Sequence, residues 1–298
     1  KSNLKIGLSL SGGIDSNFLL SFFVNNINKN IHTYSIIDED SRYNEEELIN
    51  YSIKKLKVKN TKIYLSNKNN YFDKLKTLIK YHDKPVSTIS YFLQSYIYKK
   101  MSDDNIKICI SGNGADELFA GYYHHYVLYY NTLKNKNEKK AFLNSWKNNI
   151  LPILRSEEYK KINKKNIKSF FTFFDNDDLK KRNVKMPQEK IFTKNILKNK
   201  MLNELTLQTM PLALLEDDLN AMFYSIENRS PFLNKDLVNL ALNMPTHLLM
   251  KNSFNKYLLR VSSKGLIGDK IRLNREKKGF NASFYSIFSF ENKRFKDW

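Results

Sequence analysis

The stretch Leu8-Ser9-Leu10-Ser11-Gly12-Gly13-Ile14-Asp15-Ser16 decides the fold of this 298-residue chain. An apolar run ends here in a serine, two glycines and an aspartate, and apolar residues at helical spacing follow at once. This order is typical of a buried parallel strand that enters a helix through a phosphate-binding turn. The glycines let the backbone approach an anion, and the helix N-terminus directs free N–H groups towards it. A tight strand-to-helix turn without a ligand is the alternative interpretation.

A second loop, Ser111-Gly112-Asn113-Gly114-Ala115-Asp116-Glu117, repeats the pattern after another apolar strand run. In a parallel sheet both loops lie beyond the carboxyl ends of the strands, where ligands bind. We therefore expect Asp15 and Asp116 to meet at one pocket. Two carboxylates suit a hard cation such as Mg²⁺ that bridges phosphate oxygens. Two unrelated turns with solvated acids are the alternative.

Strand and helix patterns alternate through the first 120 residues, which predicts an α/β fold with a doubly wound, mostly parallel sheet. From about Gly121 the pattern becomes helical to the end of the chain. We expect residues 1–125 to form the α/β part and residues 126–298 a helical part with a variable insertion at about 134–200. The predicted strands are residues 4–10, 32–37, 61–65 and 106–110, and the predicted helices begin near Ser16 and cover residues 44–55, 71–81 and 90–100.

The composition is typical of a protein with a large apolar core and without a membrane-spanning segment. Hydrophobic residues make up 41% of the chain, enough for a large core, and no apolar run is long enough to cross a membrane. The single Cys109 lies in an apolar run, so we expect a packed strand residue and a reducing, cytoplasmic setting. Because the strand pattern begins by Leu4 and the first residue is Lys1, we expect an excised part of a longer protein.

The formal net charge of +20 does not by itself define a partner. A basic surface attracts nucleic acid, anionic membranes or acidic substrates. Here lysines are scattered with Asn and Ile along the whole length, without an arginine-rich arm or an RNA-binding signature. We therefore do not expect nucleic acid as a partner.

Taken together, the motifs resemble the asparagine synthetase family. The first loop is similar to the pyrophosphatase-type loop of ligases that release AMP and pyrophosphate, and the second loop, extended to Tyr122, is similar to a second family signature. The other matching stretches follow in the same order between about Leu4 and Phe284, and they are Asp83-Lys84-Pro85, Met222 through Glu227-Asn228-Arg229-Ser230-Pro231-Phe232-Leu233, Lys256-Tyr257-Leu258-Leu259-Arg260 and Lys277-Lys278-Gly279-Phe280.

This resemblance implies one synthetase domain over residues 1–298 with a PP-loop fold like that of adenine nucleotide alpha-hydrolases. It implies a carbon–nitrogen ligase that uses ATP and Mg²⁺ to activate a carboxylate, aspartate first, as an acyl-adenylate. The adenylate then reacts with ammonia to give the amide, asparagine. In most members an N-terminal glutaminase domain supplies the ammonia, and this chain does not contain that domain. We therefore expect a glutaminase domain in the full-length protein and leave a homodimer open.

The resemblance also implies roles for individual residues. Lys277 would neutralise charge on the α-phosphate, and Asn113 and Asp116 complete the candidate catalytic set. Asp15 and Asp116 match the magnesium-binding aspartates. The residues matching the pyrophosphate cradle are Ser11, Gly12, Gly13 and Ser16, and those matching the adenine and ribose wall are Ser9, Ile36, Ser111 and Gly112. Taken alone, Lys277 in the run Arg275-Glu276-Lys277-Lys278 would be a solvated basic residue.

Three further charged residues have two interpretations. Arg229 and Arg260 lie in helical segments that face the site in the family, yet either could belong to a structural ion pair. Glu227 could be the partner in such a pair.

The chain departs from the family pattern at three positions. Asn113 stands where the family usually has an acid beside the reacting carbonyl, and an amide cannot act as a general base. Asn234 stands where the Pro-Phe-Leu motif is usually followed by Asp, and Leu219 replaces a usual arginine. These changes leave the acceptor carboxylate open.

Three alternatives to an aspartate-amidating ligase therefore remain. The acceptor could be a sugar uronate or a natural-product acid, or the chain could be a non-catalytic ATP-binding module. A tRNA-modifying relative of the same first loop would usually need catalytic cysteines, and Cys109 is a poor candidate.

Overall fold

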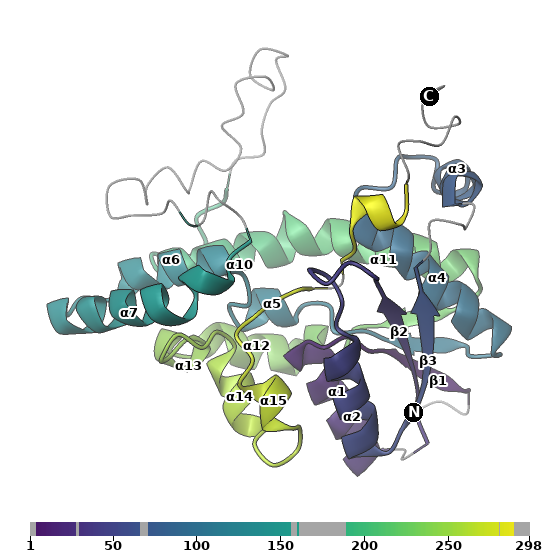
Figure 1. The fold of residues 1–298 in the computed structure, drawn as a ribbon. Coiled ribbons are helices and arrows are strands. Elements are labelled where there is room, and N and C mark those ends of the chain that lie inside the picture. The colour runs from purple at the N-terminus through teal and green to yellow at the C-terminus, as the bar shows by residue number, and fades with distance from the viewer. Residues whose placement is uncertain are drawn as a thin grey trace. The chain divides into compact units, whose positions relative to one another are not determined.

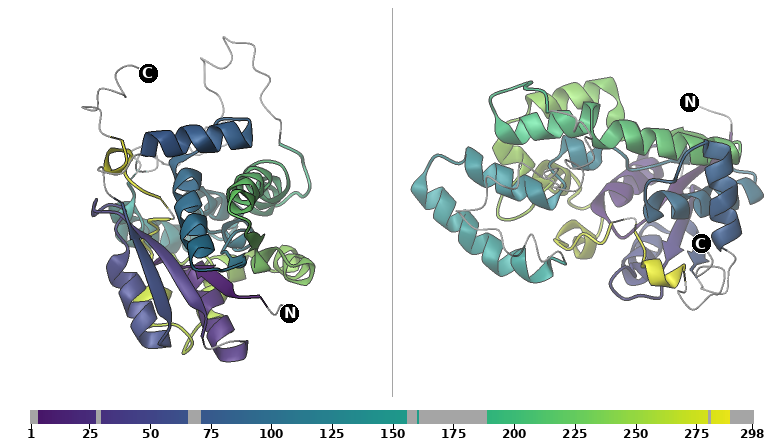
Figure 2. Two further views of the ribbon diagram at one scale, coloured as in Figure 1. Left: turned by 90° about the vertical axis from the view of Figure 1, so that its right-hand side faces the viewer. Right: turned by 90° about the horizontal axis from the view of Figure 1, so that it is seen from above.

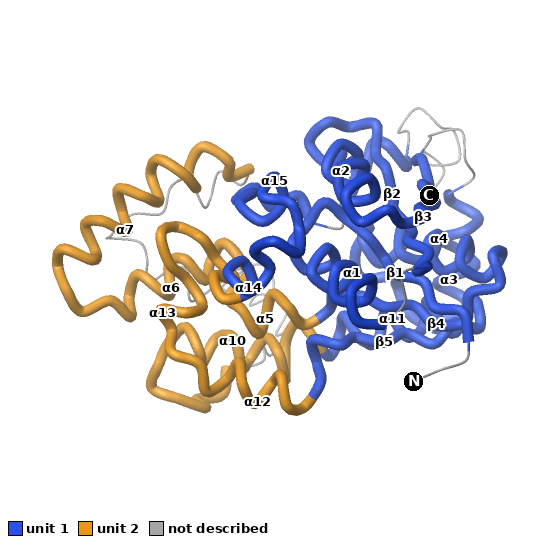
Figure 3. Tube along the Cα trace, turned by 90° about the horizontal axis from the view of Figure 1, so that it is seen from below, with its two compact units in different colours: residues 1–113, 211–234, 259–298 blue, residues 114–210, 235–258 orange. Residues whose placement is uncertain are grey.

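The computed structural model describes residues 4–27, 30–65, 71–155, 160, 189–279 and 281–288. The chain divides into two compact units (Figure 3). Unit 1 holds residues 1–113, 211–234 and 259–298, and unit 2 holds residues 114–210 and 235–258. Two late segments thus complete the unit that contains the sheet, whereas the sequence prediction divided the chain at residue 125.

Unit 1 is built on a five-stranded, all-parallel sheet in the order β3-β2-β1-β4-β5. The central strand β1 pairs with β2 on one side, Gly7 opposite His32, and with β4 on the other, Gly7 opposite Cys109. This sheet confirms the predicted α/β class, and the four predicted strands are all present. The strands are β1 (Ile6–Ser9), β2 (His32–Ile37), β3 (Lys59–Tyr64), β4 (Ile108–Ile110) and β5 (Glu227–Arg229).

The strand order places a topological switch point between β1 and β4. The chain leaves β1 towards β2 and β3 on one side and later returns to β4 and β5 on the other. Right-handed crossovers then put helices on both faces. Helices α1 (Ile14–Asn26) and α2 (Glu46–Leu56) cover one face, and α4 (Ile89–Asp103) and α11 (Thr209–Phe223) cover the other, as Figures 1 and 2 show. Helix α3 (Tyr71–His82) precedes α4.

Burial on both faces explains the apolar strand runs. On the α4 and α11 face, one core cluster joins Tyr34 of β2, Tyr98 of α4 and Cys109 of β4 to Ala221 of α11. Cys109 is 1% exposed, which confirms the prediction of a packed strand residue. The sheet is therefore a rigid platform beneath the loops at its carboxyl edge.

The prediction of an entirely helical chain after Gly121 is wrong at β5. This strand consists of three polar residues, so neither alternation nor an apolar run marks it in the sequence. It forms because the free edge of β4 supplies the ladder: Glu227 N–H donates to Lys107 O at 2.9 Å, and Ser111 N–H donates to Arg229 O at 3.0 Å. Arg229 consequently lies in a strand, not in the helix that the family resemblance implied.

The last part of unit 1 consists of short elements joined by an extended segment. They are η3 (Pro231–Leu233), α14 (Tyr257–Ser262), whose first two residues belong to unit 2, α15 (Asp269–Arg272) and η4 (Phe284–Ser286). We call residues 274–279 and 281–288 the C-terminal strap. Asp38 at the end of β2 holds it, because its carboxylate accepts from Ser283 N–H at 2.7 Å and from Ser286 Oγ at 2.6 Å.

Unit 2 is helical in the residues described. Tyr126 and Trp146 pack their rings 5.4 Å apart between α6 and α7. Of the predicted variable insertion at about 134–200, the structure describes residues 134–155, 160 and 189–200, which include α7, η1 and the first residues of α10. The elements are α5 (Ala115–Leu118), α6 (Tyr123–Thr132), α7 (Lys136–Asn149), η1 (Leu151–Ile153), α10 (Ile196–Thr206), α12 (Lys235–Asn243) and α13 (Thr246–Leu249).

Within the described ranges, no helix combines the length and the apolar character that a membrane crossing requires.

Candidate active site

The first glycine loop is held in shape by its own serines. Ser16 Oγ accepts from Ser11 N–H at 3.2 Å and lies 3.1 Å from Ser11 Oγ, which in turn accepts from Gly13 N–H at 3.2 Å. Asn17 Nδ2 donates to the carbonyls of Ser11 and Gly13. Gly13 is the N-cap of α1 and provides no side-chain cap. The free N–H groups of the first helical turn therefore remain directed at the loop, as an anion site requires.

A carboxylate of the protein already binds one donor of this loop. Gly12 N–H donates to Glu45 Oε2 at 3.0 Å, and Glu45 is the N-cap residue of α2. A Cβ on Gly12 would lie 3.0 Å from atoms of Leu48, so only glycine lets the loop come this close to α2. The contact with Glu45 is direct support for an anion-binding backbone at Gly12. Sequence reasoning missed Glu45, whose only signal was its place in the loop after the neighbouring strand.

The second loop packs against the first across the switch point. A Cβ on Gly112 would lie 3.3 Å from Asp15 Cβ and 3.6 Å from Ser16 N, so the two loops touch at a glycine. Ser111 Oγ lies 3.2 Å from Ser230 Oγ. The structure thus brings together Ser11, Gly12, Gly13, Asp15, Ser16, Ser111 and Gly112 from the predicted set.

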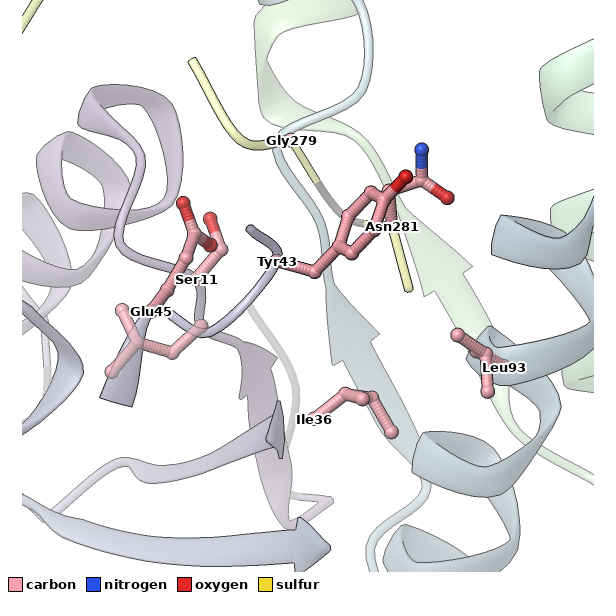
Figure 4. Close-up of a pocket in the computed structure, with 8 residues that line it drawn as sticks. Ser11, Ile36, Tyr43, Glu45, Leu93, Gly279 and Asn281 are labelled. Carbon is pink, nitrogen blue, oxygen red and sulfur yellow. The ribbon is translucent and has the colours of Figure 1, made fainter. Parts of the chain in front are cut away.

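A pocket opens beside the first loop, over the end of β2 (Figure 4). Its polar wall comes from Ser11, Tyr43 and Asn281, and its apolar wall includes the predicted Ile36. Apolar side chains combined with a few polar groups are typical of small-molecule sites. The lining residues are Leu10, Ser11, Ile36, Tyr43, Glu45, Leu93, Gly279 and Asn281. Ser9 lies at the end of β1, in register with Tyr34, and is not among them.

The C-terminal strap carries Lys277 near this pocket. Gly279 and Asn281 of the strap line the pocket, and Lys278 Nζ donates to the carbonyls of Ser41 and Asn44 at 3.0 and 2.9 Å. Lys277 is half-buried, and its Nζ is shielded from solvent. The strap therefore holds Lys277 as part of the fold, not as a solvated basic residue.

Arg260 fixes the start of the strap. Its Nη1 donates to Arg272 O at 2.7 Å and to Asn274 O at 2.8 Å, and the residue is 6% exposed. The Arg229 side chain instead pairs with Glu227, Nε to Oε1 at 2.7 Å, on the exposed surface of β5. Arg260 therefore supports the backbone leading to Lys277, and Arg229 and Glu227 form the structural pair that was one of the two interpretations.

The two predicted magnesium ligands lie in different units, so their joint binding of one cation remains a prediction. Asp15 lies in the first turn of α1, directly beside Gly112 of the second loop. Asp116 lies in α5, and its Oδ1 contacts Nζ of the buried Lys256 at 2.7 Å. Both carboxylates have the donor chemistry that Mg²⁺ prefers. Asp116 forms an ion pair with Lys256, which begins one of the matching stretches but was given no role from the sequence.

Asn113 belongs to a buried polar network at the ends of β4 and β5. Its Nδ2 donates to Asp217 Oδ2 at 2.8 Å, and Asp217 is fully buried in α11. Tyr98 OH and Asn228 Nδ2 also donate to this carboxylate. Burial raises the pKa of Asp217 to about 7 in spite of these three donors. Sequence reasoning missed Asp217, because an acid on a helix reads as a surface residue.

A second cluster, in unit 2, contains His124, His125 and Glu204. His125 Nδ1 accepts from Tyr122 N–H at 3.3 Å, so Nε2 carries the ring proton and donates to Glu204 Oε2 at 2.8 Å. A metal ion could bind at Nε2 only through a free lone pair on that nitrogen, and a protonated Nε2 has none. The cluster is therefore a hydrogen-bonded link between α6 and α10.

Comparison with known proteins places the chain in a family. Residues 1–298 match the asparagine synthase family, so the chain belongs to it. It is 27% identical over 305 residues to "Asparagine synthetase [glutamine-hydrolyzing] 1" of Bacillus subtilis (strain 168), an alignment that covers 94% of this chain and 46% of that protein. The chain thus spans about half the length of this relative.

Two solved structures are similar at a lower level. An NMN synthetase from Francisella tularensis gives a TM-score of 0.32 at 14% identity, over 69% of this chain and 87% of that one. The U34-tRNA thiolase NcsA from Methanococcus maripaludis with its [4Fe-4S] cluster gives 0.31 at 10% identity, over 85% and 83%. The family assignment rests on the sequence matches.

The raised pKa of Asp217 predicts a pH-dependent stability. Its pKa is 3.8 in the unfolded chain and about 7 in the fold, so the folded state binds more protons between these values. The contribution of Asp217 to the free energy of unfolding should therefore fall as pH rises from about 4 to 7, by on the order of 4 kcal/mol, and level off above.

Denaturant unfolding of the wild type and Asp217→Asn between pH 4.5 and 8.5 measures this effect. The difference in stability, wild type minus variant, should decrease up to about pH 7. Parallel pH curves for the two proteins would contradict it.

The Glu45 contact predicts a competition with added anions. An anion at Gly12 must displace a charged carboxylate, and Glu45→Gln leaves an uncharged, weaker acceptor there. We expect this variant to bind inorganic pyrophosphate roughly 3- to 10-fold more tightly in titration calorimetry, equivalent to about 1 kcal/mol. Glu39→Gln, an exposed change in the same β2–α2 loop, is the control and should bind like the wild type. Unchanged affinity in Glu45→Gln would show that Glu45 does not compete.

Proposed function

We propose that this chain is the synthetase part of an ATP-dependent amide-forming ligase. It activates a carboxylate as an acyl-adenylate with release of pyrophosphate and transfers the acyl group to ammonia. The observation that carries this proposal is the contact between two glycine loops at the β1–β4 switch point, in a member of the asparagine synthase family. An intracellular setting and a glutaminase domain elsewhere in the full-length protein belong to the same proposal.

Different residues bind the phosphates, the adenine and the ribose of ATP. The N–H groups of Gly12 and Gly13, with the hydroxyls of Ser11 and Ser16, bind the pyrophosphate part of ATP. The pocket at Ile36 takes the adenine, with its apolar wall against the ring faces. Ser9, Ser111 and Gly112 border the ribose.

Charge neutralisation completes the first half-reaction. Lys277 stabilises the charge that develops on the α-phosphate as the carboxylate attacks, which requires only a cation in place. Asp15 and Asp116 would hold Mg²⁺, which screens the charge of the phosphate oxygens. The shielded position of Lys277 Nζ strengthens this effect, because less water surrounds the cation.

Aspartate is the first candidate for the acceptor carboxylate, with asparagine as product. A sugar uronate or a natural-product acid is the second candidate, because Asn113 stands where the family usually has an acid beside the reacting carbonyl. A non-catalytic ATP-binding module is the third, and it predicts nucleotide binding without turnover.

One assay tests the proposal. The chain is incubated with ATP, Mg²⁺ and ammonium, with aspartate or a panel of other carboxylic acids, and pyrophosphate and amide are measured. We expect pyrophosphate release that depends on one class of acid. Pyrophosphate release indifferent to every acid tried would contradict the ligase proposal, and tight ATP binding without release would support the binding module.

Lys277→Ala should lower the rate constant for pyrophosphate release roughly 10²- to 10³-fold, because a charge-stabilising group of the transition state is lost. The KM for ATP should change much less. Lys277→Arg keeps the cation and should retain part of the rate. Lys264→Ala, an exposed lysine elsewhere in unit 1, is the control. Turnover of Lys277→Ala at the wild-type rate would remove this lysine from the mechanism.

A further inference from the structure

The buried Asp217 determines which end of the Asn113 amide faces the site. Asp217 accepts from donors on three separate elements: Tyr98 OH from α4, Asn228 Nδ2 from β5, and Asn113 Nδ2 from the second loop. A carboxylate with three donors directed at its two oxygens is placed to act as an acceptor. The NH₂ end of Asn113 is therefore drawn inward to Asp217.

The carbonyl end of the same amide consequently points the other way. Asn113 directly follows Gly112, the residue that contacts Asp15 of the first loop. The Asn113 side chain is half-buried, and among the described residues its Oδ1 has no hydrogen-bond partner. Oδ1 is thus a fixed hydrogen-bond acceptor beside the glycine loops.

We propose that Asp217 is a positioning residue that fixes Asn113 Oδ1 as the acceptor for an N–H of the attacking nitrogen, an inference that rests on the proposed ligase function. The substrate class it selects is ammonia or a primary amine, because such a nucleophile offers N–H donors. An amide turned the other way would present its NH₂ group, which would donate to the nitrogen lone pair and so compete with the attack of that lone pair on the acyl carbon.

The amide orients the nucleophile and takes up no proton. The lone pair of ammonia forms the new C–N bond to the acyl carbon of the adenylate. The bond from that carbon to the AMP oxygen breaks, and its electron pair leaves with AMP. The proton lost from nitrogen passes to solvent water, because a neutral amide oxygen is not basic enough to hold it.

The pH dependence follows from the groups around Asp217. Tyr98 on α4, Cys109 on β4 and Asp218 on α11 are the titratable groups that interact with it. Burial raises the pKa of Tyr98 and of Cys109, so both stay neutral near pH 7. Protonation of Asp217 would turn one of its oxygens into a donor and release the Asn113 amide to rotate. Use of free ammonia should therefore rise as Asp217 ionises.

The test compares wild type, Asp217→Asn and the exchange variant Asn113→Asp/Asp217→Asn in the amide assay. An amide at position 217 accepts on one oxygen only, so Asn113 loses its fixed partner. We expect Asp217→Asn to lose roughly 10- to 100-fold in kcat/KM for ammonia, with the KM for ATP within about twofold of wild type. The exchange variant restores the hydrogen bond with donor and acceptor reversed and should recover part of the loss.

Two further measurements separate positioning from a structural role. The profile of kcat/KM against pH, calculated for free ammonia, should show an ionisation near pH 7 in the wild type and none in Asp217→Asn. Side-chain amide NMR with ¹⁵N-asparagine should show a slowly exchanging Asn113 NH₂ group, assigned with Asn113→Asp, that Asp217→Asn loses. Asp103→Asn, an exposed change on α4 that does not contact Asp217, is the control and should behave like the wild type.

Unchanged ammonia kinetics in Asp217→Asn would overturn the inference, and so would equal losses in ATP and ammonia use with no change in the pH profile. A wild-type chain that forms no amide from any acid would overturn the proposed function and with it the role of Asn113 in catalysis. The NMR result distinguishes the cases, because it reports the fixed amide without turnover.

Discussion

The close approach of two backbone loops at the carboxyl ends of β1 and β4 is the constraint on which the site depends. A Cβ at Gly112 would lie 3.3 Å from Asp15 Cβ, so a side chain there would push the loops apart. The strand order makes β1 and β4 neighbours, although about 100 residues separate them in sequence. The sheet thus fixes where the loops meet, and glycine allows them to touch.

The hydrogen bonds of Asp217 connect two segments from late in the sequence, α11 and β5, to the second glycine loop. Helix α11 and strand β5 enter unit 1 only after the chain has passed through unit 2. They bring Asp217 and Asn228 to the loop that carries Asn113. A buried carboxylate destabilises the fold unless donors surround it, and three donors from three elements do so here. A buried acid of this kind specifies one arrangement of its partners at some expense in stability.

The sequence was sufficient to predict the sheet and both glycine loops, because each depends on a local pattern. Buried strands and helices require apolar residues at regular spacing, and this spacing is visible in the strand runs and in the segment after Ser16. Strand β5 has no such pattern, since the edge of β4 alone makes it a strand. Asp217, Glu45 and Lys256 could not be predicted for a related reason: an acid or a lysine has the same local pattern on a surface as in a buried pair.

The hydrogen bond between Gly12 N–H and Glu45 affects which anions the first glycine loop can bind. A backbone N–H that binds a carboxylate exchanges one charged acceptor for another when a phosphate arrives, so the net gain from that donor is small. Selectivity must then come from groups that a single carboxylate cannot satisfy together. Four such groups come from two segments. The first glycine loop and the start of α1 provide the hydroxyls of Ser11 and Ser16 and the N–H of Gly13, and the C-terminal strap provides the shielded cation of Lys277. A polyphosphate can span several such donors at once, whereas the carboxylate of Glu45 is a single anionic group bound at the Gly12 N–H. The cradle therefore favours ligands with several linked anionic groups over any lone carboxylate, including its own.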